Sequence, residues 1–207
     1  MSQHVLSAPT LIDTVWRGSD GARYLRYIVL AVVGTALIAL SAKIQVPFWP
    51  VPMTMQTFAI LVVGMAYGAR LGGATVALYL AEGAVGLPVF AGGGGIAYFT
   101  GPTTGYLVGF LAAAVIVGAL AERGWDRSVS KTLLANTLGT LVIFIPGVLW
   151  LAAFMMRGSG LDAATGLMSA WTAGALPFLA GAAAKIALAA AVMPLAWRLV
   201  GRRAARD

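Results

Sequence analysis

The chain has 207 residues, of which 60% are hydrophobic and only 10% are charged. A soluble domain carries about 25% charged residues, so this composition excludes an ordinary soluble globule and predicts an integral membrane protein. The chain contains no cysteine, which excludes disulfides and thiolate metal sites. Its single histidine, His4, belongs to the N-terminal tail, so we expect neither a zinc site nor histidine catalysis, and no cofactor.

Apolar runs follow one another along the chain, and a spanning helix needs about 20 mostly apolar residues. We predict six spanning helices, at residues 24–42, 53–69, 71–82, 106–121, 132–156 and from 177 to about 200. Residues 1–22 are then a cytoplasmic tail, residues 23–201 a single membrane domain, and residues 202–207 a basic tail. Pro177 suits the first turn of the last helix, so we interpret Leu167–Leu176 as an outer lid or interfacial segment.

The placement of the charges predicts the orientation, because cytoplasmic loops carry the excess of Lys and Arg. With the N-terminus inside, the outer side holds only Lys43 and Arg157, and Lys185 falls within a helix. The cytoplasmic side then holds the other eleven, namely Arg17, Arg23, Arg26, Arg70, Arg123, Arg127, Lys131, Arg198, Arg202, Arg203 and Arg206. This bias places both termini in the cytoplasm. It also accounts for the net charge of +7 without nucleic acid.

The three outer connections, at residues 44–52, 83–105 and 157–176, are long and rich in proline, glycine or aromatic residues. Irregular backbone at membrane depth is tolerated where it is buried in protein or lines a cavity. We therefore expect these loops to cap an outward-facing ligand pocket.

Lys185 is the most informative residue, because a charge within a spanning helix costs about 2.5–3.5 kcal/mol. One interpretation is a cation that faces the bundle interior and binds an anionic ligand group. The alternatives are a lysine that snorkels outward, or one that pairs with Glu82 for structure alone. Glu82 itself is either a ligand contact or an interfacial acid that neutralises Lys43 or Lys185.

Polar and aromatic side chains near the outer connections complete the candidate site. Thr54, Gln56 and Thr57 stand at the start of the second helix, where Thr54 is equally suited to capping that helix. The aromatic residues of the loops suit either pocket walls or the interfacial belts of any membrane protein. The candidate ligand contacts are Lys185, Glu82, Gln56, Thr54, Trp49, Tyr79, Tyr98 and Tyr106.

The first helix carries Ala31, Thr35 and Ala39 at four-residue spacing. Small residues at this spacing let another helix approach closely in lipid. The pattern is common in membrane helices, so by itself it only permits a helix–helix contact.

Several longer motifs carry a family resemblance. SAKIQVPFWPVPMTMQTF at 41–58, LYLAEGAVGLPVFAGGGG at 78–95, GPTTGYLVGF at 101–110 and PFLAGAAAKIAL at 177–188 resemble the BioY family, the biotin-specific S components of energy-coupling factor transporters. The resemblance implies a six-helix fold in the bacterial cytoplasmic membrane and a biotin pocket near its outer face. It also implies a transmembrane T component and ABC-type ATPases as partners. It places the stripe of Ala31, Thr35 and Ala39 towards the T component.

One position departs from the family pattern. The family usually shows an Asp three residues before the lysine of the last helix, whereas this chain has Ala182. Residues three apart share a helix face, so Lys185 lacks its nearest expected partner. The chain also contains no Walker motif, so any ATP-driven step requires the partner subunits.

Biotin capture for a transporter complex has two alternatives from other functional classes. A stand-alone carrier or channel, working without ATPase partners, remains an alternative. An intramembrane enzyme is disfavoured, because the chain offers no histidine, cysteine or carboxylate pair at membrane depth.

Overall fold

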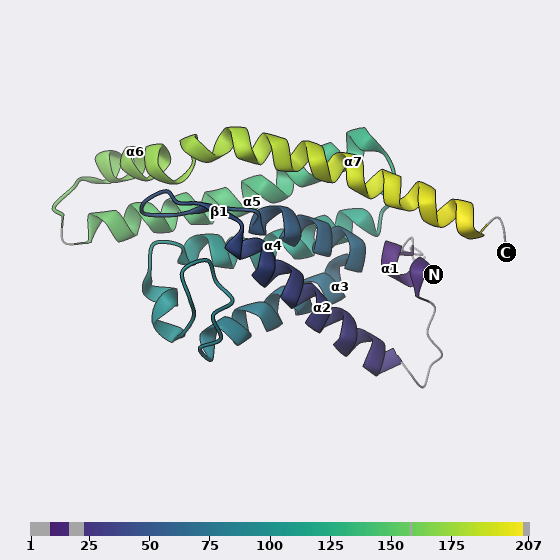
Figure 1. Ribbon diagram of the computed structural model, residues 1–207. Coiled ribbons are helices and arrows are strands. Elements are labelled where there is room, and N and C mark those ends of the chain that lie inside the picture. The colour runs from purple at the N-terminus through teal and green to yellow at the C-terminus, as the bar shows by residue number, and fades with distance from the viewer. Residues whose placement is uncertain (1–8, 17–22, 158, 205–207) are drawn as a thin grey trace, which may run out of the picture.

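The computed structural model describes residues 9–16, 23–157 and 159–204, and this part of the chain is almost entirely helical (Figure 1). Parts of the predicted N-terminal tail, at residues 1–8 and 17–22, lie outside the described residues, as do residues 205–207 of the predicted basic tail. The helices are α1 (Leu11–Val15), α2 (Arg23–Lys43), α3 (Gln56–Ala84), α4 (Thr104–Ala121), α5 (Val129–Met156), α6 (Ala163–Gly174) and α7 (Leu179–Ala204). Two short 3-10 helices, η2 (Ile96–Thr100) and η3 (Leu176–Phe178), and the antiparallel strands β1 (Gln45–Val46) and β2 (Met53–Thr54) complete the fold.

The described residues contain five helical segments that are long and apolar enough to cross a membrane. Three of these segments are longer than the about 17–25 residues of a usual span. They are α3, α5 and the continuous stretch Ala163–Val200, which contains α6, η3 and most of α7.

α3 consists of two helical legs that fold back on each other at Gly68, whose backbone has a φ of 80° and a ψ of 177°. A straight helix would separate Gln56 from Tyr79 by about 34 Å, at ~1.5 Å per residue. Instead the Gln56 amide donates a hydrogen bond of 2.7 Å to the Tyr79 hydroxyl. The sequence predicts two helices here with a break at residue 70, and the structure places the turn two residues earlier.

The turn at Gly68 is closed by a carboxylate from the neighbouring helix. Glu122, which follows α4, accepts a hydrogen bond of 2.9 Å from the backbone N–H of Ala69. The free N–H groups at a helix start need such a partner. Beyond the turn, the two legs pack closely because Gly64 and Gly72 face each other, and a Cβ on Gly72 would lie 3.0 Å from the Gly64 Cα.

The end of the bundle that holds this turn, here called the Gly68 end, also gathers α1, the α4–α5 loop and the last turns of α7 (Figure 1). Arg26 forms an ion pair of 2.8 Å with Asp13 of α1. The indole N–H of Trp197 donates to the buried carboxylate of Asp126. Burial raises the pKa of Asp126, an effect that the hydrogen bond from Trp197 opposes.

The opposite end of the bundle holds the β1–β2 hairpin, the loop between α3 and α4, and α6. Phe90 anchors the glycine-rich loop between α3 and α4. Phe90 is 1% exposed and its ring packs against those of Tyr79, Tyr98 and Phe99. Lys43, at the end of α2, donates a hydrogen bond of 2.7 Å to the backbone oxygen of Phe90.

α6 lies along α5, and η3 separates it from α7 (Figure 1). Its buried positions are Gly166, Ala170 and Gly174, which are small enough for close packing. The predicted outer segment is therefore a helix that begins a few residues earlier than expected. α7 starts two residues after Pro177 and continues through residues 202–204, where the sequence predicts the start of a basic tail.

Candidate functional site

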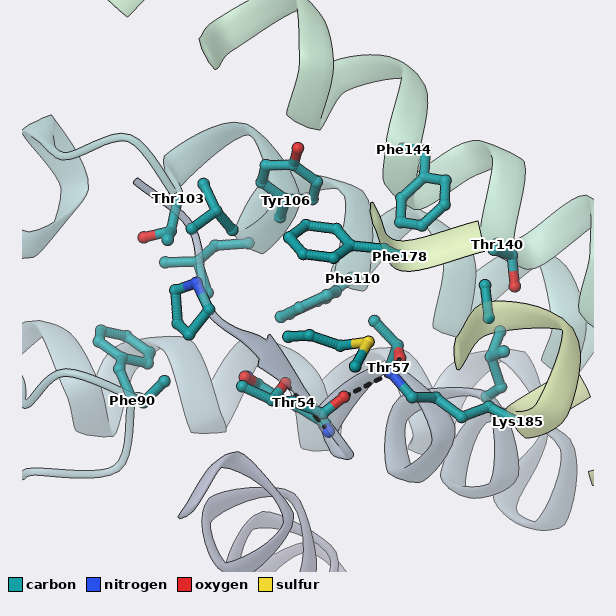
Figure 2. Close-up of a pocket in the computed structure, with 18 of the residues that line it drawn as sticks. Thr54, Thr57, Phe90, Thr103, Tyr106, Phe110, Thr140, Phe144, Phe178 and Lys185 are labelled. Carbon is teal, nitrogen blue, oxygen red and sulfur yellow. Dashed lines mark hydrogen bonds between the residues drawn. The ribbon is translucent and has the colours of Figure 1, made fainter. Parts of the chain in front are cut away.

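A pocket opens between β2, α3, α4, α5 and α7 at the hairpin end of the bundle (Figure 2). The space between its walls, including open solvent at the mouth, is ≈ 740 Å³. Its aromatic walls are Phe90, Tyr98, Tyr106, Phe110, Phe144 and Phe178. Its polar lining side chains are those of Thr54, Gln56, Thr57, Thr103, Thr140 and Lys185.

Lys185 supplies the only charge among the lining residues. It lies six residues beyond the first residue of α7, about 9 Å along the helix. Figure 2 shows its side chain reaching Thr54 and Thr57: the ammonium donates to the Thr54 carbonyl over 2.6 Å and to the Thr57 hydroxyl over 3.2 Å. An ammonium has three donors, so one remains for a ligand.

Lys185 forms no ion pair with any carboxylate in the described part of the chain. The alternative pairing of Lys185 with Glu82 is therefore not observed. Glu82 instead accepts a hydrogen bond of 3.1 Å from Thr35 of α2. Because the cation lies in a partly buried, mostly apolar pocket, an anionic group of the occupant would gain a charge-assisted contact there.

Gln56 and Thr54 line the pocket where α3 begins. The Thr54 hydroxyl accepts a hydrogen bond of 3.2 Å from the backbone N–H of Gln56, so this residue supports the helix start as well as facing the pocket. Tyr79 does not line the pocket. It is fully buried behind Gln56, and its hydroxyl donates to the Val89 carbonyl over 3.1 Å, which joins the second leg of α3 to the glycine-rich loop.

The two tyrosines predicted at the site, Tyr98 and Tyr106, both line the pocket but have different surroundings. The hydroxyl of Tyr106 donates a hydrogen bond of 2.7 Å to the Gly174 carbonyl at the end of α6. Tyr106 therefore contributes its ring to the pocket while its hydroxyl anchors α6. Tyr98 packs its ring against Phe90 at a centroid distance of 4.7 Å.

The structure corrects two further expectations about ligand contacts. Trp49 is 85% exposed on the loop of the β hairpin and is not a lining residue, because the loop turns its ring outward. Glu82 is not a lining residue either, because its carboxylate faces α2.

The small-residue stripe of α2 is only partly accessible. Thr35 is only 3% exposed, and its hydroxyl donates a hydrogen bond to Glu82. This threonine therefore faces the chain's own α3. Ala31 and Ala39 are half-buried. A partner that approaches this face would therefore meet these two alanines rather than the threonine between them.

Among the pocket residues that sequence reasoning missed are Phe110, Thr140, Phe144 and Phe178. The three phenylalanines stand in apolar segments where lipid-facing and pocket-facing side chains look alike. Thr140 carried a usable signal. It belongs to a series of polar residues at four-residue spacing, with Thr132 and Asn136, inside a mostly apolar helix.

The model of the BioY family matches residues 12–202. The chain belongs to the BioY family. The protein described as a probable biotin transporter BioY in Pyrococcus horikoshii is 37% identical over 173 residues, which cover 83% of this chain and 94% of the relative. The biotin transporter BioY of Rhodobacter capsulatus is 34% identical over 166 residues, covering 76% and 85% of the two chains.

A solved structure matches as well. It is the crystal structure of the S component for biotin from an ECF-type ABC transporter, with a TM-score of 0.68 and 23% sequence identity. The match covers 87% of this chain and 95% of the other. At this identity the likeness concerns the fold, and it shows that this BioY family member shares its helical arrangement with an S component.

Proposed function

We propose that this BioY family member captures biotin at the outer face of the bacterial cytoplasmic membrane and serves its uptake. The observation that carries the proposal is the pocket itself, which combines aromatic walls with a lone cation that has no carboxylate partner in the described part of the chain. Biotin offers an apolar fused-ring body, a ureido group with donors and an acceptor, and a carboxylate tail. These features suit apolar walls, a few hydroxyl and amide groups, and one ammonium. Titration of the purified chain with labelled biotin tests the proposal, which fails if no saturable binding is found.

We further propose six membrane crossings with both termini in the cytoplasm. The two legs of α3 run in opposite directions, so each counts as one crossing and α3 adds two to those of α2, α4, α5 and α7. This arrangement puts the Gly68 end inside and the pocket outside. It also agrees with the distribution of Lys and Arg.

Cysteine labelling tests this orientation, and the chain has no native cysteine to interfere. Ser159 and Arg123 are both exposed, at opposite ends of the bundle. Ser159→Cys should react with an impermeant thiol reagent in intact cells, whereas Arg123→Cys should react only after the cells are opened. Labelling of Arg123→Cys from outside would overturn the assignment.

The proposed partners are a transmembrane T component and a pair of ABC-type ATPases, consistent with the fold match to an S component. In this proposal, Ala31 and Ala39 on α2 provide close contact with the T component. Ala31→Leu and Ala39→Leu should each lower ATP-dependent biotin uptake by the assembled complex several-fold, because a bulkier side chain separates the two helices. Their biotin affinity should stay near that of the parent. An equal loss of binding and uptake would show that these alanines pack the chain's own core.

A stand-alone carrier remains the second candidate. It would move biotin in liposomes that contain this chain alone, whereas a capture subunit would bind biotin there without net transport. Uptake by the reconstituted lone chain therefore separates the two functions.

A further inference from the structure

Three polar side chains follow one face of α5 inside the bundle: Thr132, Asn136 and Thr140. They are four residues apart and hence lie on successive turns. Their exposed fractions are 0%, 0% and 8%. Polar groups inside a membrane bundle are costly unless they are hydrogen-bonded or serve a function, so each of the three requires a partner.

Thr132 is satisfied within the protein. Its hydroxyl lies 2.8 Å from the Ser128 carbonyl and 3.0 Å from the Trp125 carbonyl, within hydrogen-bond distance of both. The Asn136 amide nitrogen donates to the Thr132 carbonyl over 2.8 Å and lies 3.6 Å from the sulfur of Met65. The Asn136 amide oxygen is buried and has no hydrogen-bond partner among the described residues.

The Thr140 hydroxyl is also unusual. A threonine within a helix often donates to the carbonyl four residues earlier, as Thr75 does to Leu71 over 2.8 Å. Thr137, the neighbour of Thr140 on the same helix, does so to Leu133 over 2.9 Å. Thr140 makes no such bond, and no hydrogen bond is found for its hydroxyl in the part of the chain that the structure describes.

The side of the pocket nearest the Gly68 end, formed by Thr140 and Leu61, is here called the pocket floor. The Thr140 hydroxyl lies at this floor and the Asn136 amide lies beneath it. Thr140 of α5 and Leu61 of α3 line the pocket. One turn towards the Gly68 end, Asn136 meets Met65, which is four residues after Leu61. Asn136 is therefore beneath the floor, about 6 Å along the helix from Thr140.

We propose that Asn136 and Thr140 together hold one ordered water at the pocket floor, and that a polar group of the ligand binds to this water. Side chains on successive turns have Cβ atoms about 5–6 Å apart. Two hydrogen bonds of about 2.8 Å to a shared water span this distance. Such a water gives a buried acceptor its missing partner, and a contact made through it is nearly as favourable as a direct one.

The ligand-binding part of this inference rests on the proposed function, whereas the water site does not. The first experiment is therefore a crystal structure of the unliganded protein at a resolution that shows ordered water. Density should lie within hydrogen-bond distance of the Asn136 amide oxygen and the Thr140 hydroxyl, and it should vanish in Asn136→Leu. A parent structure without water at this position overturns the proposal.

The second experiment is a double-mutant cycle with biotin as the ligand. Asn136→Leu and Thr140→Val should each weaken biotin binding about 5-fold, because each loses the same water-mediated hydrogen bond. The double variant should also lose about 5-fold rather than about 25-fold, because the two side chains act through one water. Thr137→Val, which removes a hydroxyl from the same helix outside the pocket, should leave affinity unchanged.

Asn136→Leu is expected to unfold within a few degrees of the parent, because leucine has a similar volume and removes the polar amide together with the need for its water. The unfolding temperature of this variant therefore distinguishes a lost water contact from a damaged fold. Unchanged affinity in Asn136→Leu, or losses that multiply in the double variant, would show that the ligand does not use the water. A parent chain that binds no biotin would refute the proposed function instead, and the crystal structure would still decide the water site.

Discussion

Replacing Lys185 by methionine should weaken biotin binding by about 10-fold or more, because a charge-assisted contact contributes roughly 1.5–3 kcal/mol. Methionine keeps most of the length and apolar volume of the side chain, so the pocket wall remains. The cation is the only charge in the pocket lining, and no carboxylate pairs with it in the described residues. The carboxylate of biotin is therefore its expected partner.

The methyl ester of biotin provides the matched comparison, because the ester carries no negative charge. Lys185→Met should weaken ester binding much less than acid binding in parallel titrations. Equal losses for the acid and the ester would exclude the carboxylate pairing. Lys185 would then act through its bonds to Thr54 and Thr57, which join α7 to the start of α3.

Ala182→Asp is the companion variant, since Ala182 and Lys185 both line the pocket and lie three residues apart on α7. A new carboxylate at this position would be close enough to pair with the ammonium. If it captures Lys185, affinity for the acid should fall while affinity for the ester is nearly unchanged. A rise in affinity for both ligands would mean that the new carboxylate binds another part of biotin.

Replacing Gly68 by alanine should destabilise the protein more than any other small substitution considered for this chain. The backbone of Gly68 has a φ of 80° and a ψ of 177°, a region adopted essentially by glycine alone, and other residues held in such regions cost about 1–3 kcal/mol. The added Cβ would also lie 2.6 Å from the Glu122 carboxylate oxygen and 2.9 Å from a Thr10 methyl group. The contact with Glu122 threatens the hydrogen bond that this carboxylate accepts from the N–H of Ala69.

Thermal unfolding in detergent measures this effect, and a loss of about 3 kcal/mol corresponds to a fall in Tm of about 6–12 °C for a chain of this size. Gly92→Ala is the matched control. Gly92 does not need a positive φ, and the nearest atom to its added Cβ, on the Tyr98 ring, lies at 3.5 Å. Gly92→Ala should unfold near the parent temperature. An equally small effect of Gly68→Ala would contradict the sharp turn within α3.

The amino-acid sequence by itself determined that this is a membrane protein built from apolar helices, and it predicted a pocket beneath the long outer connections. Charge-poor runs of spanning length are incompatible with a soluble globule, and the uneven distribution of Lys and Arg predicts the orientation. Lys185 could be singled out because a charge inside a membrane helix is costly wherever that helix packs. The family motifs could also be recognised from the sequence alone, because each is a continuous stretch of chain.

Only the tertiary structure decided which side chains meet. In an apolar helix, residues that face lipid and residues that face a pocket have the same composition, so Phe110, Phe144 and Phe178 carried no distinguishing signal. Glu82 and Trp49 looked suitable by residue type and lie elsewhere, because the packing of α3 against α2 and the path of the β hairpin direct their side chains away from the pocket. The hydrogen-bond partners of Lys185 could not be predicted from the sequence either. Thr54 is 131 residues away along the chain, and only the packing of α7 against the start of α3 brings the two residues together.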